Sequence, residues 1–483
     1  MTEGIFPLAR RQRRRGREQL SDPDAEVVSF LADWAPLHAI ASELPHWEPG
    51  DVGRPPHMPP ALALIFGIMR WAWGSERAVE RQLRHRATWE PVRARLHQHY
   101  PDYIGVASGA AAPSRSQYRR FVQTYGIDDE VFQRLLDAFR EQAAAEAQRL
   151  GALNPATRNQ LTHPEPTNFV SGDVTLLRSR FRAARGARYV DPNTAEIYER
   201  LYDPDAETYT GTDGEGNQNQ RVLGTRWLLT HVWLPHTQER VLLDIVHIDQ
   251  SLRNEGDAAV DSVTAIAART GGVTGLVYDM AVRGRHRELL YQRGMLTITR
   301  VPSRSGGKGR RLGRYPATQR DGTRTDVELW TIDGTPHIRE VAAGEPQFVA
   351  LKRVQTRRRP GKRGSVRWYN QYVIPDHPLV REQLRGAVVL VRLDDPDFET
   401  RRPGGVSRAD NLHAIAPGDH DWYRVFALRP PAESMNNWVK QRLPNKRAPA
   451  VGKKRQYFAL LCAGLYNNAR AVLAHTERLS KAA

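Results

Sequence analysis

The sequence predicts an α/β protein whose sheet follows an all-α region and is interrupted by a β-rich insertion. Three observations lead to this class. Apolar residues recur at helical spacing from Asp24 to about Leu150. Strand-like runs then alternate with helical segments from Asn168 to Val301. A series of short β-like runs fills the interval from Pro302 to His420, ahead of two more helical segments.

The length of the chain predicts the number of domains, and its charge predicts the chemical class of its binding partner. A chain of 483 residues is long enough for two or three domains, each with its own core. Lys and Arg number 71 against 54 Asp and Glu, a formal net charge of +17, which favours a polyanion such as nucleic acid. A generally basic protein is the alternative, but the charge lies in tracts almost without acids. One cysteine, Cys462, excludes disulfides within the chain and indicates an intracellular protein.

Residues 1–23 are predicted to be a basic arm. Six arginines lie between Arg10 and Arg17, and no apolar segment of the signal-peptide kind follows them. The longest apolar run, Ala61 to Trp73, is interrupted by Arg70 and is shorter than the roughly 20 residues that span a bilayer. We therefore expect no membrane segment and a cytoplasmic protein, and the resemblance described below implies that it is associated with the nucleoid.

Residues 24–162 are predicted to form a helical DNA-binding domain. Ser114 is a candidate N-cap for a short helix that carries Arg115, Gln117 and Arg119, side chains suited to phosphates and base edges. A solvated basic helix face explains the same residues equally well, so both interpretations stay open. The prolines of His163 to Pro166 then predict a linker.

Residues 167–302 are predicted to be the first part of an α/β core. Two acids stand out: Asp173, which shares one strand face with Thr175, and Asp279, which follows a buried apolar run. Asp249 is a rival strand-end acid, and an aspartate at a strand tip is most often only a turn former. The expected strands are Asn168 to Leu177, Arg221 to Leu234, Gln238 to Ile248, Val273 to Tyr278 and Met295 to Val301, with helices from Asp257 to Arg269 and up to Tyr291.

Residues 303–420 are predicted to be a β-rich basic insertion. Basic loops are expected at Arg304 to Arg314 and Lys352 to Arg367, between β-like runs. The second loop has no acid and carries the candidate DNA contacts Arg357, Arg358 and Lys362, ahead of Trp368. Basic residues beside an aromatic suit backbone tracking with base stacking. Trp330 is another stacking candidate, and a position in the β core is the alternative for both tryptophans. The β-like runs are Val327 to Ile332, Phe348 to Val354, Val366 to Ile374 and Val388 to Leu393.

Residues 421–483 are predicted to close the core. The apolar run around Val425 predicts a strand, which Pro430 stops, and a helix should run from about Pro431 to Leu443. Glu433, Asn437 and Lys440 then share one helix face. An acid in a first helical turn also complements the helix dipole, a role that stabilises by only about 0.3–1 kcal/mol. A last helix is expected from about Lys453 to Glu477.

The spacing of Arg429, Glu433 and Lys440, with three and then six residues between them, resembles the signature of DDE insertion-sequence transposases of the insertion-sequence-four group. That signature places a tyrosine three residues before the arginine. Here the position is Phe426, so the hydroxyl is missing or comes from Tyr423. The order of strands and helices is similar to that of the ribonuclease H-like, integrase-like core, which these transposases interrupt with a β-rich insertion.

The resemblance implies that Asp173 and Asp279, on strand one and at the tip of strand four, act with Glu433. The three acids would hold two Mg²⁺ ions, or Mn²⁺ in their place, because two-metal phosphodiester chemistry needs hard oxygen ligands. Asp173 would contact both ions. Arg429 and Lys440 would hold DNA phosphates, with a weaker case for Asn437.

The activity implied is metal-dependent cleavage at transposon ends, followed by transfer of the freed 3′-OH into target DNA. The partner would be double-stranded DNA with terminal inverted repeats, bound by a homodimer or larger assembly. Two alternatives stay open. A catalytically inactive, transposase-derived DNA-binding protein need not keep the acids, and a stand-alone ribonuclease H-like nuclease needs neither the helical region nor the insertion.

Overall fold

The computed structural model describes most of the chain, and all structural statements below refer to that part. The described residues are 23–45, 57–124, 128–155, 161–182, 186–190, 192, 194–199, 201–211, 220–249, 254–301, 309–342, 344–361, 366–394 and 408–482. The predicted basic arm, apart from Pro23, and the candidate DNA contact Lys362 lie outside these residues.

Among the described residues from 23 to 149, the regular elements are all helices, as predicted for this region. The central helix, α3, is buried on nearly every side, as an apolar helix inside a bundle should be. The helices are α1 (Pro23–Leu31), α2 (Ala35–Ala41), α3 (Pro60–Trp73), α4 (Glu76–Leu83), α5 (Arg86–His99), α6 (Arg115–Thr124) and α7 (Asp129–Arg149). Short 3₁₀ turns lie at Ile104–Val106, Pro166–Asn168, Glu382–Leu384 and Pro444–Lys446.

The first sheet has the order β6-β5-β1-β7-β8, and β4 also pairs with the beginning of β5. β5 is antiparallel to both β1 and β6, whereas β1, β7 and β8 are parallel. The strands are β1 (Phe169–Arg178), β4 (Glu207–Gly211), β5 (Gln220–Leu234), β6 (Glu239–Ile248), β7 (Gly275–Val277) and β8 (Leu296–Ile298), and a separate ribbon joins β2 (Arg188–Val190) to β3 (Ile197–Glu199). The five strands predicted for this region are confirmed.

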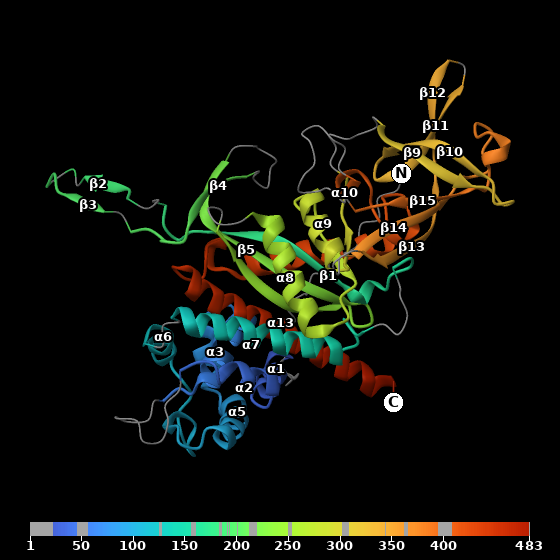
Figure 1. Ribbon diagram of the computed structural model, residues 1–483. Coiled ribbons are helices and arrows are strands. Elements are labelled where there is room, and N and C mark those ends of the chain that lie inside the picture. The colour runs from blue at the N-terminus through green and yellow to red at the C-terminus, as the bar shows by residue number, and fades with distance from the viewer. Residues whose placement is uncertain are drawn as a thin grey trace, which may run out of the picture.

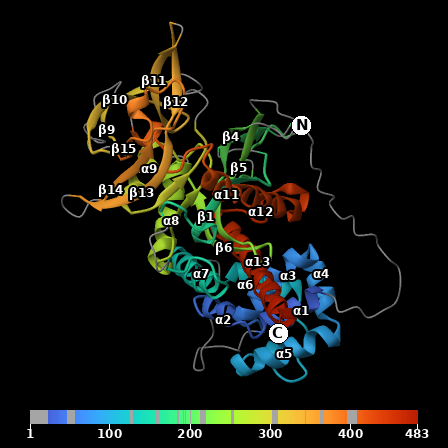
Figure 2. The same cartoon turned by 90° about the vertical axis from the view of Figure 1, so that its right-hand side faces the viewer.

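Helices cover both faces of this sheet. The predicted helices are present as α8 (Glu255–Thr270) and α9 (Gly284–Gln292). α8 and α12 (Arg429–Arg442) lie on opposite sides of β1 (Figure 2). The long α13 (Lys453–Ala482) passes along β6 (Figure 1).

Asparagines of α13 satisfy the backbone of the edge strand β6. Asn468 accepts from the N–H of Leu242 at 2.7 Å and donates to the carbonyl of the same residue at 2.9 Å. Asn467 donates to the Arg240 carbonyl at 2.7 Å. The register between β5 and β6 shifts at this point, so these backbone groups would otherwise lack partners.

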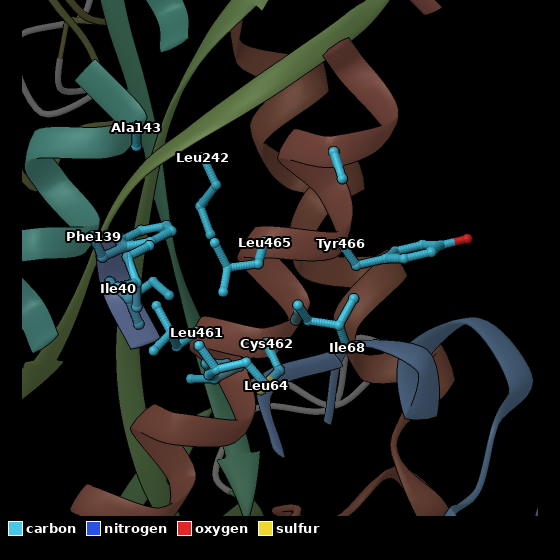
Figure 3. Packing of buried hydrophobic residues seen from close by; sticks show 14 of the residues in the cluster. Ile40, Leu64, Ile68, Phe139, Ala143, Leu242, Leu461, Cys462, Leu465 and Tyr466 are labelled. Atoms are coloured by element: carbon cyan, nitrogen blue, oxygen red, sulfur yellow. The ribbon is translucent and has the colours of Figure 1, made fainter. Parts of the chain in front are cut away.

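The N-terminal helices and the sheet share one buried core. Side chains of α2, α3, α7, β6 and α13 meet there, including Phe139, Leu242 and Leu461 (Figure 3). α3 and α13 approach closely at Gly67, where an added Cβ would lie only 2.6 Å from the Cys462 sulfur. α13 therefore packs against both the helical region and the sheet.

A second sheet occupies most of the predicted β-rich segment, in the order β12-β11-β10-β9-β15-β14-β13. Its strands are β9 (Arg310–Thr318), β10 (Arg324–Ile332), β11 (Thr335–Ala342), β12 (Glu345–Ala350), β13 (Lys352–Pro360), β14 (Val366–Val373) and β15 (Val388–Arg392). The prediction of a basic loop from Lys352 to Arg367 is wrong for the residues described there. They pair as β13 and β14, because backbone ladder bonds do not depend on side-chain charge.

The predicted strand around Val425 is also wrong, because these residues form α11 (His420–Phe426). Trp422 and Val425 are buried three residues apart, as on one helix face, and the Asp419 side chain caps the helix by accepting from the Asp421 N–H at 2.9 Å. A short helix, α10 (Arg408–Asn411), precedes it. None of the helices described is both long enough and apolar enough to cross a membrane.

Candidate active site

Two neighbouring parallel strands bring Asp173 and Asp279 together. Ser171 of β1 pairs with Val277 of β7, and each acid lies two residues further along its own strand direction. The ladder continues past β7, since the Tyr278 N–H donates to the Ile298 carbonyl at 3.1 Å. Adjacent strands are about 4.8 Å apart, so the two acids are neighbours on one face of the sheet. The Asp279 carboxylate also accepts from the Ala281 N–H at 2.7 Å, which fixes the turn that follows.

The third acid arrives on α12, which packs along β1. Two prolines lie in the first turn of α12, where their missing N–H groups cost nothing. The Ser171 hydroxyl donates to the Leu428 carbonyl at 3.2 Å and ties the beginning of α12 to β1. Glu433 therefore lies beside Asp173, although its side chain is 60% exposed.

Arg429 lies between two of the acids. Its Nη2 is 3.1 Å from Glu433 Oε1 and 3.8 Å from Asp173 Oδ1. Its Nη1 is buried and has no hydrogen-bond partner. Arg429, predicted to hold a DNA phosphate, thus contacts two carboxylates.

The amide that contacts Asp173 belongs to Asn436, and the predicted Asn437 does not face the acids. Asn436 Nδ2 donates to Asp173 Oδ2 at 2.8 Å, and Asn436 Oδ1 is buried without a partner. Asn437 is exposed and accepts from the Gln441 amide at 3.3 Å. Helical spacing does not choose between them, because Asn436 lies seven residues after Arg429 and Asn437 lies four residues after Glu433.

The electrostatics place the three acids in one neighbourhood. Burial raises the pKa of Asp173 above its ordinary value, and the charges of Asp279 and Glu433 raise it further, whereas Arg429 and the Asn436 amide lower it. Burial lowers the pKa of Lys440, and the nearby Asp173 opposes that shift. Lys440 and Arg429 therefore supply positive charge on the α12 side of Asp173.

A fourth carboxylate, Glu255, lies close to these acids at the beginning of α8, and we did not predict it. It is paired with Arg226 and accepts from the Tyr278 hydroxyl at 3.1 Å. Burial raises the pKa of Glu255, and the charge of Asp279 adds to that shift. The sequence gives little indication of it, because an acid in a first helical turn is common. The rival Asp249 follows β6, which β5 separates from β1.

The other predicted DNA contacts lie away from the acids. Arg115 is half-buried at the beginning of α6, and Arg119 is exposed and paired with Glu76 at 2.7 Å. In β13, Arg357 donates to the side chains of Gln355 and Gln371 at 2.6 and 3.0 Å. These contacts neither support nor exclude binding to phosphates.

Trp368 cannot stack on a base. Its side chain is 0% exposed, its indole N–H donates to the Tyr291 carbonyl at 2.7 Å, and the exposed Arg358 lies over its ring. The prediction of a DNA contact at Trp368 is therefore wrong, and the alternative position in the β core is the observed one. The period-2 alternation of β14 directs Trp368 inward.

The donor set fits a hard divalent cation in type. Asp173, Asp279 and Glu433 offer carboxylate oxygens, the ligands that Mg²⁺ prefers, and Asn436 adds a buried oxygen without a partner. Over the described residues, however, no three His, Cys, Asp or Glu side chains are close enough together to hold an ion as they stand. Glu433 is turned toward Arg429 and would have to rotate to join the other two.

Comparisons with known proteins add no family. No protein-family model matches the chain, and no curated protein is significantly similar to it in sequence.

Proposed function

We propose that the chain is a DDE-type DNA transposase with a ribonuclease H-like core. The observation that carries the proposal is that three carboxylates lie near one another although they come from β1, the end of β7 and α12. They are Asp173, Asp279 and Glu433. The strand order and directions of the first sheet, and the β-rich sheet between β8 and α12, support it further.

The substrate of this reaction is double-stranded DNA. Water attacks the phosphodiester at a transposon end and releases a 3′-OH, which then attacks a target phosphodiester. Asp173, Asp279 and Glu433 would hold Mg²⁺, which, when bound, neutralises charge on the attacking and leaving oxygens. Arg429 and Lys440 bind the phosphates of the DNA end, Arg429 through its planar guanidinium and Lys440 as a point charge. The net charge of +17 favours this polyanionic partner.

Joining two ends to one target requires two sites, so the assembly on DNA is a homodimer or larger. The protein would act on the DNA of its host, in the cytoplasm. The DNA that flanks the gene provides a direct check: terminal inverted repeats bounded by short direct repeats are expected.

A DNA-binding protein without catalysis is the second candidate. One observation favours it: Glu433 pairs with Arg429, and the described acids are not close enough together to hold an ion as they stand. The two candidates differ in whether Glu433 is needed for chemistry.

The Glu433→Gln variant separates the two candidates. If Glu433 is a metal ligand, the swap should abolish Mg²⁺-dependent nicking of a labelled duplex that carries a terminal repeat, because a hard cation needs the lost charge. Binding of the same duplex, measured by gel shift, should remain. α12 begins at Arg429, so Glu433 lies beyond its first turn and the predicted dipole role does not apply. A purely structural role, as the i,i+4 partner of Arg429, predicts intact nicking and a loss of only about 0.3–0.5 kcal/mol of stability.

Glu477→Gln is the matched control, since Glu477 is also exposed and forms an i,i+4 ion pair, with Lys481. It should nick DNA at the wild-type rate. Wild-type protein that binds the repeats but never nicks them would support the non-catalytic candidate.

A further inference from the structure

We propose that Asn436 is a positioning residue of the acidic site: its side-chain amide sets the orientation in which the Asp173 carboxylate receives a divalent cation. The inference rests on the proposed function, since it takes the acids to be a cation site. It assigns a role to a residue that is not part of the motif formed by Arg429, Glu433 and Lys440.

The first support is the hydrogen bond itself. Asn436 Nδ2 donates to Asp173 Oδ2 at 2.8 Å, while Asp173 Oδ1 faces Arg429. The two oxygens thus have different partners. Because a carboxylate on a strand can rotate about its side-chain bonds, holding Oδ2 determines where Oδ1 points.

The second support is that Asn436 is itself rigidly placed. Its side chain belongs to the buried face of α12, between Met435 and Val439, and the residue is only 4% exposed. α12 is tied to β1 by the hydrogen bond from Ser171 to Leu428. The amide and the carboxylate are therefore held on two elements that are fixed to each other.

The third support is the unpartnered oxygen of the same amide. Asn436 Oδ1 is buried and accepts no hydrogen bond. Leaving a buried oxygen unsatisfied is destabilising, and this indicates that a proton donor arrives with a ligand. A hydrated Mg²⁺ fits, because this ion keeps several waters, each of which can donate.

The arrangement also explains why one of two adjacent asparagines would matter. Asn436 and Asn437 are consecutive, chemically identical and on the same helix, but only Asn436 faces Asp173. The same substitution at the two positions is therefore a closely matched pair.

The test measures Mn²⁺ binding to the full chain without DNA, by the electron paramagnetic resonance signal of the free ion. Asn436→Leu preserves approximate shape but removes the amide, and it should weaken Mn²⁺ binding by about 10- to 100-fold, as for other residues that orient a metal ligand. Asn437→Leu should bind Mn²⁺ like the wild type. If Asn436→Leu does not fold, Asn436→Ala, a strong helix former, gives the same comparison.

A purely structural role for Asn436 predicts a different pattern, with a lower melting temperature but unchanged Mn²⁺ affinity. That pattern would overturn the inference. Asp173→Asn separates this failure from failure of the proposed function. If the wild type and Asp173→Asn bind Mn²⁺ equally, the acids are not a cation site and the proposed function falls. If Asp173→Asn loses binding while Asn436→Leu retains it, only the role of Asn436 is refuted.

Discussion

A guanidinium lies between two carboxylates where α12 meets β1. Arg429 is 3.1 Å from Glu433 and 3.8 Å from Asp173, so its positive charge compensates the acids. Under the proposed function, a DNA phosphate would bind Arg429 and a divalent ion would bind the carboxylates that Arg429 contacts.

Removing the guanidinium should therefore strengthen cation binding in the absence of DNA. We expect Arg429→Gln to bind Mn²⁺ several-fold more tightly than the wild type, since a nearby unit charge repels the ion by on the order of 1 kcal/mol. The same variant should bind DNA ends more weakly. Titration calorimetry with Mn²⁺ and gel shifts with a terminal-repeat duplex measure the two effects.

Arg134→Gln, in α7, removes one charge from the helical region, where Arg134 pairs with Glu43 and Glu130. It should leave the Mn²⁺ affinity unchanged. Equal affinities for Arg429→Gln and the wild type would mean that the guanidinium does not compete for the carboxylates in solution.

The individual site residues were predictable to different degrees. The spacing of Arg429, Glu433 and Lys440 carries a motif, so these residues could be selected from the sequence. Asn436 could not be preferred over Asn437, because either lies near the motif face and only the packing of α12 on β1 decides between them. The prediction that Trp368 contacts DNA was wrong because the sequence shows that basic residues surround it but not which side of β14 faces the core.

At the scale of elements, the β13–β14 hairpin presents its arginines in two ways. Arg357 is held by two glutamine side chains. Arg358 and Arg359 are exposed and lie over the rings of Trp368 and Tyr369, and Arg358 also donates to the Gly294 carbonyl at 2.9 Å. The exposed pair is the better placed to meet phosphates.

The double variant Arg358→Ala, Arg359→Ala should weaken binding to every DNA sequence alike. Each lost phosphate contact should lower the slope of log affinity against log salt by about 0.9. Fluorescence anisotropy over a series of salt concentrations measures this slope. The charge-matched control, Arg381→Ala with Arg385→Ala near the Glu382–Leu384 turn, should leave it unchanged, and an equal slope for both variants would reassign the hairpin to a solvated surface.

Elements were predicted well where one pattern excluded the others. β7 is a short, wholly buried apolar run that ends in a polar tip, which favours a central strand. α11 was mistaken for a strand because a short apolar run fits both structures. β13 was mistaken for a loop because composition shows charge, whereas pairing with β14 supplies its hydrogen bonds.

At the scale of the whole molecule, Asp421 links three parts of the chain. It contacts His163 of the linker at 2.7 Å, Arg353 of the second sheet at 3.1 Å and Arg424 of α11 at 3.1 Å. Arg353 also donates to the Thr162 carbonyl at 2.8 Å. Around the buried carboxylate of Asp421, this junction holds the linker and the β-rich sheet next to the helix that precedes α12.

The junction should make stability depend on pH. Burial would raise the pKa of Asp421, but the bonds from His163 and Arg424 and the charges of His163 and Arg353 lower it below the ordinary value. A carboxyl group whose pKa is lower in the folded protein than in the unfolded chain stabilises the fold at any pH above its unfolded pKa of about 3.9. This stabilisation is lost as the pH falls from that value through the lower pKa of the folded protein. Asp421→Asn should thus lose about 1–3 kcal/mol at pH 7, and the difference from the wild type should shrink below about pH 4.

Thermal unfolding from pH 7 down to about pH 2 measures this difference. Asp376→Asn is the control, because the Asp376 side chain is 85% exposed and pairs only with Arg385 at 3.4 Å among the ion pairs described. Such a surface pair contributes about 0–1 kcal/mol. A gap between Asp421→Asn and the wild type that stays constant with pH would mean that Asp421 acts through packing and not through its charge.

The close approach of α3 and α13 also has a consequence for how the protein is made. About 400 residues are synthesised between Gly67 and Cys462, which takes on the order of 20 to 80 s at about 5–20 residues per second. During translation the apolar α3 is therefore made long before α13, and a nascent chain that already contains Asp173 and Asp279 still lacks Glu433. If the three acids act as proposed, the growing chain cannot cut DNA until α12 has left the ribosome, and we expect activity to begin only after synthesis is nearly finished.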